Sequence, residues 1–274
     1  MTATTTPLAL PPSARSTGVV TATLKSEWTK LRTVRSTIWS LLATAGITIG
    51  LGTLFSAAIV SRWDHLDAIE RLRFDGTARS LSGIFLAQLA IGVLGVLVVG
   101  SEYTTGMIRT TFAATPRRKT VIAAKAAVLG SVALGVGLVA SFAAFGIGQS
   151  ILQSKHVGAS IGDPGVMRAI SGAGIYLAAV ALLGFGLATI VRRTPGAIAT
   201  LFGIVLVLPL LARALPSPWD NDVSKLLPAS AGESLFSVRS APDILTPGRA
   251  ALVLTVWVTV VLAGAFIATA RRDA

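Results

Sequence analysis

Six long apolar runs restrict the fold of this sequence more than any other feature. The first run, at 38–60, has 23 consecutive residues without a charge. A helix rises ~1.5 Å per residue, so this run is longer than a hydrocarbon core of ~30 Å. Further runs follow at 81–99, 121–151, 169–191, 197–212 and 250–270. None of them alternates as the strands of a membrane β-barrel do. We therefore predict an all-α polytopic membrane protein with six transmembrane helices.

The composition supports this fold class and excludes several functions. Charged residues make up 13% of the chain, about half the fraction typical of a soluble domain. The net charge of +12 would suggest a nucleic-acid partner in a soluble protein, but these cations gather at the ends of the apolar runs. We expect no nucleic-acid partner. Cysteine is absent, which excludes disulfides, thiolate metal sites and a cysteine nucleophile.

The distribution of charge predicts the orientation. Six spans place both termini on one side, together with the loop after the second span and the turn at 192–196. Counted with Lys125, this side has 14 Lys and Arg residues and three acidic residues, whereas the other side has 10 Lys and Arg residues and nine acidic residues. Basic residues near span ends remain in the cytoplasm. We expect both termini to be cytoplasmic and the protein to lie in the plasma (cell) membrane as a multi-pass protein.

The chain before the first span has two parts. Residues 1–18 are rich in Thr, Pro, Ser and Ala, a composition typical of a disordered tail. Residues 19–37 have helical periodicity and predict an amphipathic helix that lies in the headgroup region; a soluble cytoplasmic helix is the alternative. The predicted apolar face holds Val20, Leu24, Trp28, Leu31, Val34 and Ile38, and the polar face holds Lys25, Thr29, Arg32 and Ser36.

The loop at 101–120, between the second and third spans, concentrates the polar chemistry of the chain. Glu102 and Tyr103 come first, then Gly106, a short amphipathic piece with Met107 and Phe112, and a basic end. We interpret the segment as a cytoplasmic docking loop that receives force from a partner protein. We expect Glu102 to cap the next helix or to pair with Arg109. Lys125, near the start of the third span, is expected to extend to the headgroups.

No pattern indicates an enzyme. The sequence has no Gly-x4-Gly-Lys-Ser/Thr phosphate loop, no His-Glu-x-x-His and no Gly-x-Ser-x-Gly. His156 and Asp163 share one loop but are too few for a metal site. The predicted spans contain no carboxylate, which argues against a proton-coupled or sodium-coupled carrier. We expect no catalytic residue, no bound metal and no cofactor of the chain's own.

Small residues recur at helical spacing inside the spans and predict close helix packing. The pairs are Ala133 with Gly137, Gly137 with Ser141, Gly146 with Ser150, Gly184 with Ala188, and Gly92 with Gly95. The outer loop at 213–249 contains moderately apolar pieces that are too short to span. We expect short helices or a re-entrant segment there.

Taken together, these features resemble the membrane subunit (permease) of bacterial type-2 ABC transporters. Residues 24–33, LKSEWTKLRT, look like the connecting helix of that family. Residues 102–109, EYTTGMIR, followed by Pro116-Arg117-Arg118, look like its coupling-helix region, and 227–232, LPASAG, look like its extracellular re-entrant part. The resemblance covers nearly the whole chain after residue 20, with 38–274 as the six-span transmembrane domain.

The resemblance implies a transport subunit without its own ATPase site. A separate ABC ATPase subunit would bind ATP, a second permease copy or homologue would complete the path, and a hydrophobic or amphipathic cargo would move outward. The implied ATPase-coupling residues are Glu102, Tyr103, Gly106, Met107, Ile108, Arg109, Phe112, Arg117 and Arg118, and the implied interfacial-helix residues are Lys25, Trp28, Leu31 and Arg32. The alternative is a non-transporting membrane anchor or sensor that docks a cytoplasmic partner.

Overall fold

Six long helices form the bundle in the computed structural model, which describes residues 12–72, 74–114, 118–217, 219–239 and 244–271. Each is long and apolar enough to cross a membrane, which confirms the prediction of six candidate spans. They are α2 (Arg35–Arg62), α5 (Ile84–Thr104), α7 (Arg118–Leu152), α8 (Val166–Val191), the continuous run α9–η3–α10 (Thr194–Ala212) and α13 (Pro247–Arg271). Every predicted run except that at 81–99 lies within one of them; α5 begins three residues after that run starts.

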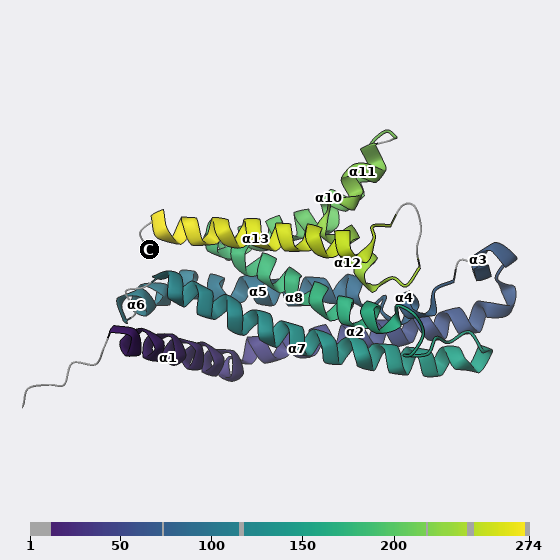
Figure 1. The fold of residues 1–274 in the computed structure, drawn as a ribbon, viewed down its shortest axis with the longest axis horizontal. Coiled ribbons are helices and arrows are strands. Elements are labelled where there is room, and N and C mark those ends of the chain that lie inside the picture. Colours follow the sequence, from purple (N-terminus) through teal and green to yellow (C-terminus); the bar gives the residue numbers. More distant parts are fainter. Residues whose placement is uncertain (1–11, 73, 115–117, 218, 240–243, 272–274) are drawn as a thin grey trace, which may run out of the picture.

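Helix α8 is the centre of the bundle (Figure 1). It packs against α5, α7 and α13, while α2 packs on α5 and α7. In its most apolar window 78% of the residues of α8 are buried, compared with 28% for α2 and for α13. Gly and Ala are dense along α8. These small side chains let three neighbours approach at once.

Glycines make the closest of these contacts. A Cβ atom on Gly95 of α5 would lie 2.0 Å from the carbonyl oxygen of Ala181, and one on Gly184 of α8 would lie 2.3 Å from the carbonyl oxygen of Gly92. On α7, a Cβ atom on Gly137 would meet α8. The predicted close packing is confirmed at these positions. Gly146 differs, because it is exposed and a Cβ atom there would have no neighbour within 4 Å.

The fifth candidate span changes helix type in its middle. It runs as α9 (Thr194–Phe202), the π-helical segment η3 (Gly203–Val207) and α10 (Leu208–Ala212). The backbone N–H of Leu208 donates to the carbonyl oxygen of Gly203, five residues earlier. Pro209 follows and has no N–H to donate. The wide turn thus comes directly before the point where the regular hydrogen-bond ladder is interrupted.

Short helices gather at one end of the bundle (Figure 1). They are η1 (Trp63–His65), α3 (Ala68–Leu72), α4 (Gly76–Ser80), η2 (Gln153–Lys155), α11 (Trp219–Lys225) and α12 (Pro228–Phe236). The short helices predicted within 213–249 are therefore confirmed. Asp75 ties this end together: its carboxylate caps α4 by accepting from Ala78 N at 3.0 Å, and it also accepts from Val238 N at 3.2 Å.

The opposite end holds α1 (Pro12–Thr33), α6 (Met107–Ala114) and the C-terminal end of α13 (Figure 1). Helix α1 starts at Pro12, whereas the sequence predicted a tail over 1–18 and a helix over 19–37; residues 1–11 lie outside the described part. It ends at Thr33 because Val34 is extended, with φ −78° and ψ 115°. That break separates α1 from the first span, so the two are not one continuous helix.

Alanine at Gly95 should destabilise the bundle. Its methyl group would overlap the backbone of α8, and overpacking of this kind costs about 1–3 kcal/mol. Gly135→Ala is the matched control, because Gly135 lies on an exposed face of α7 with nothing within 4 Å. Thermal unfolding of both variants in one detergent should show a lower Tm for Gly95→Ala alone. Equal Tm values would contradict the close α5–α8 contact.

Candidate functional site

The face that α1 turns toward the bundle is centred on Glu27 and Leu31, one helical turn apart. Glu27 is 4% exposed and Leu31 is 8% exposed, whereas Trp28 is 46% exposed. Lys25 and Arg32 are also exposed. Of the predicted apolar face, Leu31 is buried against the protein, and Val20, Val34 and Ile38 are exposed like Trp28. The contact of this exposed stripe with the membrane interface remains a prediction.

Glu27 contacts Lys125, which lies 98 positions away in the sequence, and Lys125 in turn contacts Glu102. The ammonium group of Lys125 on α7 is 2.7 Å from Glu27 Oε2 and 2.6 Å from Glu102 Oε1 on α5. Lys125 is 1% exposed and Glu102 is 6% exposed. One buried cation therefore bridges carboxylates from α1 and α5. The prediction that Lys125 extends to the headgroups is wrong, because its side chain points into the protein.

Lys30, whose side chain is partly exposed, contacts both carboxylates as well. Its ammonium group is 2.9 Å from Glu27 Oε1 and 3.0 Å from Glu102 Oε1. Burial lowers the pKa of Lys30, but the hydrogen bonds and charges of Glu27 and Glu102 outweigh this and raise the pKa above its ordinary value. The contribution of Lys30 to stability is therefore fully present below its unfolded-state pKa and is lost only as the pH rises through the raised pKa.

Glu27, Lys30, Glu102 and Lys125 form what we name the charge cluster. Its two carboxylates and two ammonium groups balance, which is the condition under which charges tolerate burial. Such a cluster contributes little net stability compared with apolar packing, but removing one member leaves a buried unpaired charge at a cost of about 3–5 kcal/mol. The cluster therefore fixes how α1, α5 and α7 sit together.

The structure also revises the expectation for Glu102. Glu102 lies in the last turn of α5 and pairs with Lys125 and Lys30, so it does not cap α6. Its second oxygen, Oε2, is buried without a hydrogen-bond partner among the described residues. The side chain of Arg109, its other predicted partner, lies outside what the structure describes.

The end of α5 is held against the start of α9 as well. The guanidinium of Arg192 lies 5.4 Å from the ring centroid of Tyr103, a cation–π contact. The hydroxyl oxygens of Thr104 and Thr194 are 3.4 Å apart. Tyr103 thus packs inside the bundle end, between the charge cluster and the basic turn. Four candidate spans meet at the base of the docking loop.

The docking helix α6 leaves this base through a single glycine. Gly106 has φ +72°, a left-handed conformation that side chains rarely adopt. Beyond it, Met107 is 51% exposed, and Ile108 is 2% exposed within the hydrophobic core. Ile108 therefore anchors α6 to its own chain in this conformation, whereas the side chain of Met107 is exposed.

The remaining predicted coupling residues are only partly described. Phe112 lies on α6, but its side chain is outside what the structure describes, and Arg117 lies outside the described residues altogether. Arg118 is the first residue of α7 and is half-buried. Among the described residues, the structure brings Glu102, Tyr103 and Ile108 into the packed base of the loop.

Sequence reasoning missed Glu27, Lys30 and Lys125 as site residues. A signal was present: the side predicted to be cytoplasmic has only three acidic residues, and two of them, Glu27 and Glu102, occur beside apolar helices. Lys125 lies seven residues inside α7. A basic residue within an apolar run either extends to the interface or pairs with a carboxylate, and Glu27 and Glu102 are the candidate partners on its side.

A second feature lies at the other end of the bundle. A cavity of about 570 Å³ opens between α5, α8, the η3–α10 segment and α12. Its walls are mostly apolar, and the Tyr176 hydroxyl donates to Gln88 Oε1 there in a buried hydrogen bond. Glu233 and Arg213 line it as well. The cavity combines an apolar body with polar groups of both signs.

Comparison with known proteins adds no assignment. No family model matches this chain, and a search of curated proteins finds no relative. The fold and the site define a helical protein with six segments suited to a membrane.

Replacing Lys125 with methionine should destabilise the fold by about 3–5 kcal/mol, because Glu102 and Glu27 would lose their buried cation. Thermal unfolding in detergent measures this, with Lys25→Met as the control, since Lys25 is exposed on α1. The double variant Lys125→Met/Glu102→Gln should lose less than the sum of the two single variants. Additive losses would show that the two side chains do not interact.

Proposed function

We propose that this chain is the permease subunit of an ABC exporter, which moves cargo outward across the plasma membrane using ATP hydrolysed by a separate subunit. One observation carries the proposal: the charge cluster joins α1, α5 and α7 at the base of α6. A docking helix is useful for transport only if its movement reaches the spans. The cluster supplies that connection through pairs that resist separation.

The arrangement supports transmission of force from α6. A partner that takes hold of Met107 would pull on a helix anchored by Ile108 in the hydrophobic core. The displacement would reach the last turn of α5, where Glu102 is bound to α7 through Lys125 and to α1 through Lys30. A shift of α6 would thus move three helices as one body, which is the behaviour of a rigid lever rather than a flexible loop.

The source of energy must lie on another chain. The sequence has no phosphate-binding loop for ATP. The bundle end that holds α1, α6 and the C-terminal part of α13 is also the more basic end, so we place it in the cytoplasm. An ATPase subunit would dock there, and a second copy or homologue of this chain would complete the membrane path.

The cavity at the opposite end is the part of this chain where cargo would bind. Its apolar walls suit a hydrophobic or amphipathic molecule, and the buried Gln88–Tyr176 pair would orient a polar group. The η3–α10 segment forms one wall, and π-turns occur frequently at functional sites. This cavity favours transport over the alternative of an anchor or sensor, which would need no such space.

A charge placed at the docking surface should uncouple the partner. Met107→Asp would put a carboxylate into an apolar contact and weaken ATPase binding about tenfold or more. Met167→Asp is the matched control, because Met167 is 50% exposed at the start of α8, at the other end of the bundle. The measurement is vanadate-sensitive ATP turnover of the P-loop ATPase that copurifies with the full chain.

Disrupting the connection between α6 and the spans should have a different effect from disrupting ATPase binding. With Glu102→Ala or Gly106→Pro, the ATPase should still bind while its stimulation by cargo disappears. Normal transport in both variants would contradict the placement of the coupling element. Transport or bond cleavage by the purified chain alone in liposomes would overturn the proposed function as a whole.

Filling the cavity should block cargo without affecting docking. Ala229→Trp places a large ring at the cavity wall and should reduce cargo transport in proteoliposomes about tenfold, while basal ATP turnover stays unchanged. Ala57→Trp, at an exposed position on α2, is the control. Unchanged transport in Ala229→Trp would exclude this cavity from the cargo path.

A further inference from the structure

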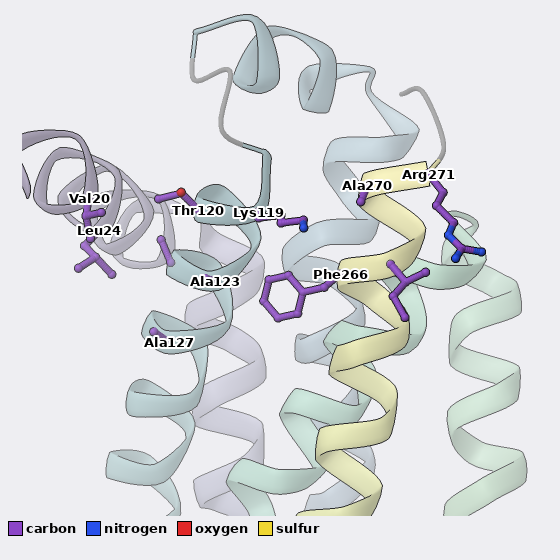
Figure 2. Close-up of a pocket in the computed structure, with 11 residues that line it drawn as sticks. Val20, Leu24, Lys119, Thr120, Ala123, Ala127, Phe266, Ala270 and Arg271 are labelled. Atoms are coloured by element: carbon purple, nitrogen blue, oxygen red, sulfur yellow. The ribbon is translucent and has the colours of Figure 1, made fainter. Parts of the chain in front are cut away.

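A groove between α1, α7 and α13 carries a feature that the transport proposal does not use (Figure 2). It has a volume of about 790 Å³. Its apolar walls are made by Val20, Leu24, Ala123, Ala127, Phe266 and Ala270. Small alanine side chains of both α7 and α13 line the space. The two helices also stand apart here, since α13 packs chiefly against α8 and α12 instead of α7.

Two cations stand at one end of this groove. Lys119 is near the start of α7 and Arg271 is the last residue of α13. Figure 2 shows both at the level of the helix ends, with Phe266 and Ala127 farther along the helices. The groove is therefore amphipathic: it has positive charge at one end and apolar walls along the helices.

The described residues supply no countercharge at this end of the groove. Among them no carboxylate lines the groove, and neither Lys119 nor Arg271 has an ion-pair partner. Glu27 and Glu102, the acidic residues of α1 and α5, are engaged in the charge cluster. The first turn of α7 has no acidic residue either, so the positive end of its helix dipole adds to the two cations.

We propose that this groove binds one anionic phospholipid of the cytoplasmic leaflet. The phosphate would lie beside Lys119, with Arg271 adding positive charge from the end of α13, and the acyl chains would lie against Ala123, Ala127 and Phe266. Free phosphate would satisfy the cations but would leave the apolar walls uncovered. A zwitterionic lipid would cover the walls but would offset its phosphate with its own cation. An anionic phospholipid satisfies both parts of the groove.

Binding there would have a structural consequence. The lipid would touch α1 at Val20 and Leu24, in the part of α1 that precedes the charge cluster. It would therefore hold the first half of α1 against α7 and α13. This proposal depends on membrane insertion and not on the identity of the cargo or of the ATPase.

Native mass spectrometry of the full chain tests the proposal, with phosphatidylglycerol and phosphatidylcholine of identical acyl chains as probes. We expect one preferred phosphatidylglycerol on the wild type. Lys119→Gln/Arg271→Gln should reduce that preference about fivefold for each cation removed. Arg35→Gln, at an exposed cation at the start of α2, should leave it unchanged. A double variant with wild-type preference would overturn the proposal.

A second pair of variants tests the apolar walls without changing charge. Ala123→Leu/Ala127→Leu fills the groove at exposed positions of α7, where folding tolerates larger side chains, and should lower phosphatidylglycerol binding several-fold. Ala251→Leu, exposed near the other end of α13, is its control. Unchanged phosphatidylglycerol binding in the filled variant would mean that the lipid does not occupy the groove. Displacement of the lipid by inorganic phosphate alone would mean that only a free-anion site exists. Either result would reject the proposal.

Discussion

The pairing of Lys125 with Glu27 and Glu102 is the interaction on which the arrangement of this bundle end depends. Lys125 is almost fully buried, so its charge is tolerable only while both carboxylates stay within hydrogen-bond distance. Those carboxylates come from α1 and α5, and their positions are thereby dictated by a side chain of α7. Lys30 adds a fourth charge that balances the group.

Helix α5 connects this site with the cavity at the opposite end. Glu102 belongs to the charge cluster, whereas Gln88, fourteen residues earlier on the same helix, lines the cavity. At ~1.5 Å per residue the two are about 21 Å apart along the axis. Gly92 and Gly95 lie between them and contact α8 closely. Movement at the docking helix would therefore reach the cavity through one stiff element packed on the bundle centre.

The long helices could be predicted from sequence because an apolar run of such length has few structures open to it in a membrane. The face of α1 that is buried against the bundle could not be predicted from sequence. Its apolar stripe suits lipid as well as protein, so periodicity alone does not decide which of the two it meets, and Glu27 is buried while Trp28 is not. The sequence left Glu27 and Glu102 as candidate partners of Lys125 but could not establish the contact with Glu27, because Glu27 lies 98 positions away and meets Lys125 only once α1 docks.

The π-helical segment η3 amounts to one residue more than a regular helix of the same rise would hold. Each residue of an α-helix turns the chain by about 100°. One residue added to a regular helix would rotate everything that follows by that angle, whereas the wide turn at Gly203–Val207 takes up the extra residue locally. Pro209 and Arg213 therefore keep their places in the cavity wall. The widened turn thus preserves the rotational phase of the outer part of this helix, and with it the side chains that the cavity presents.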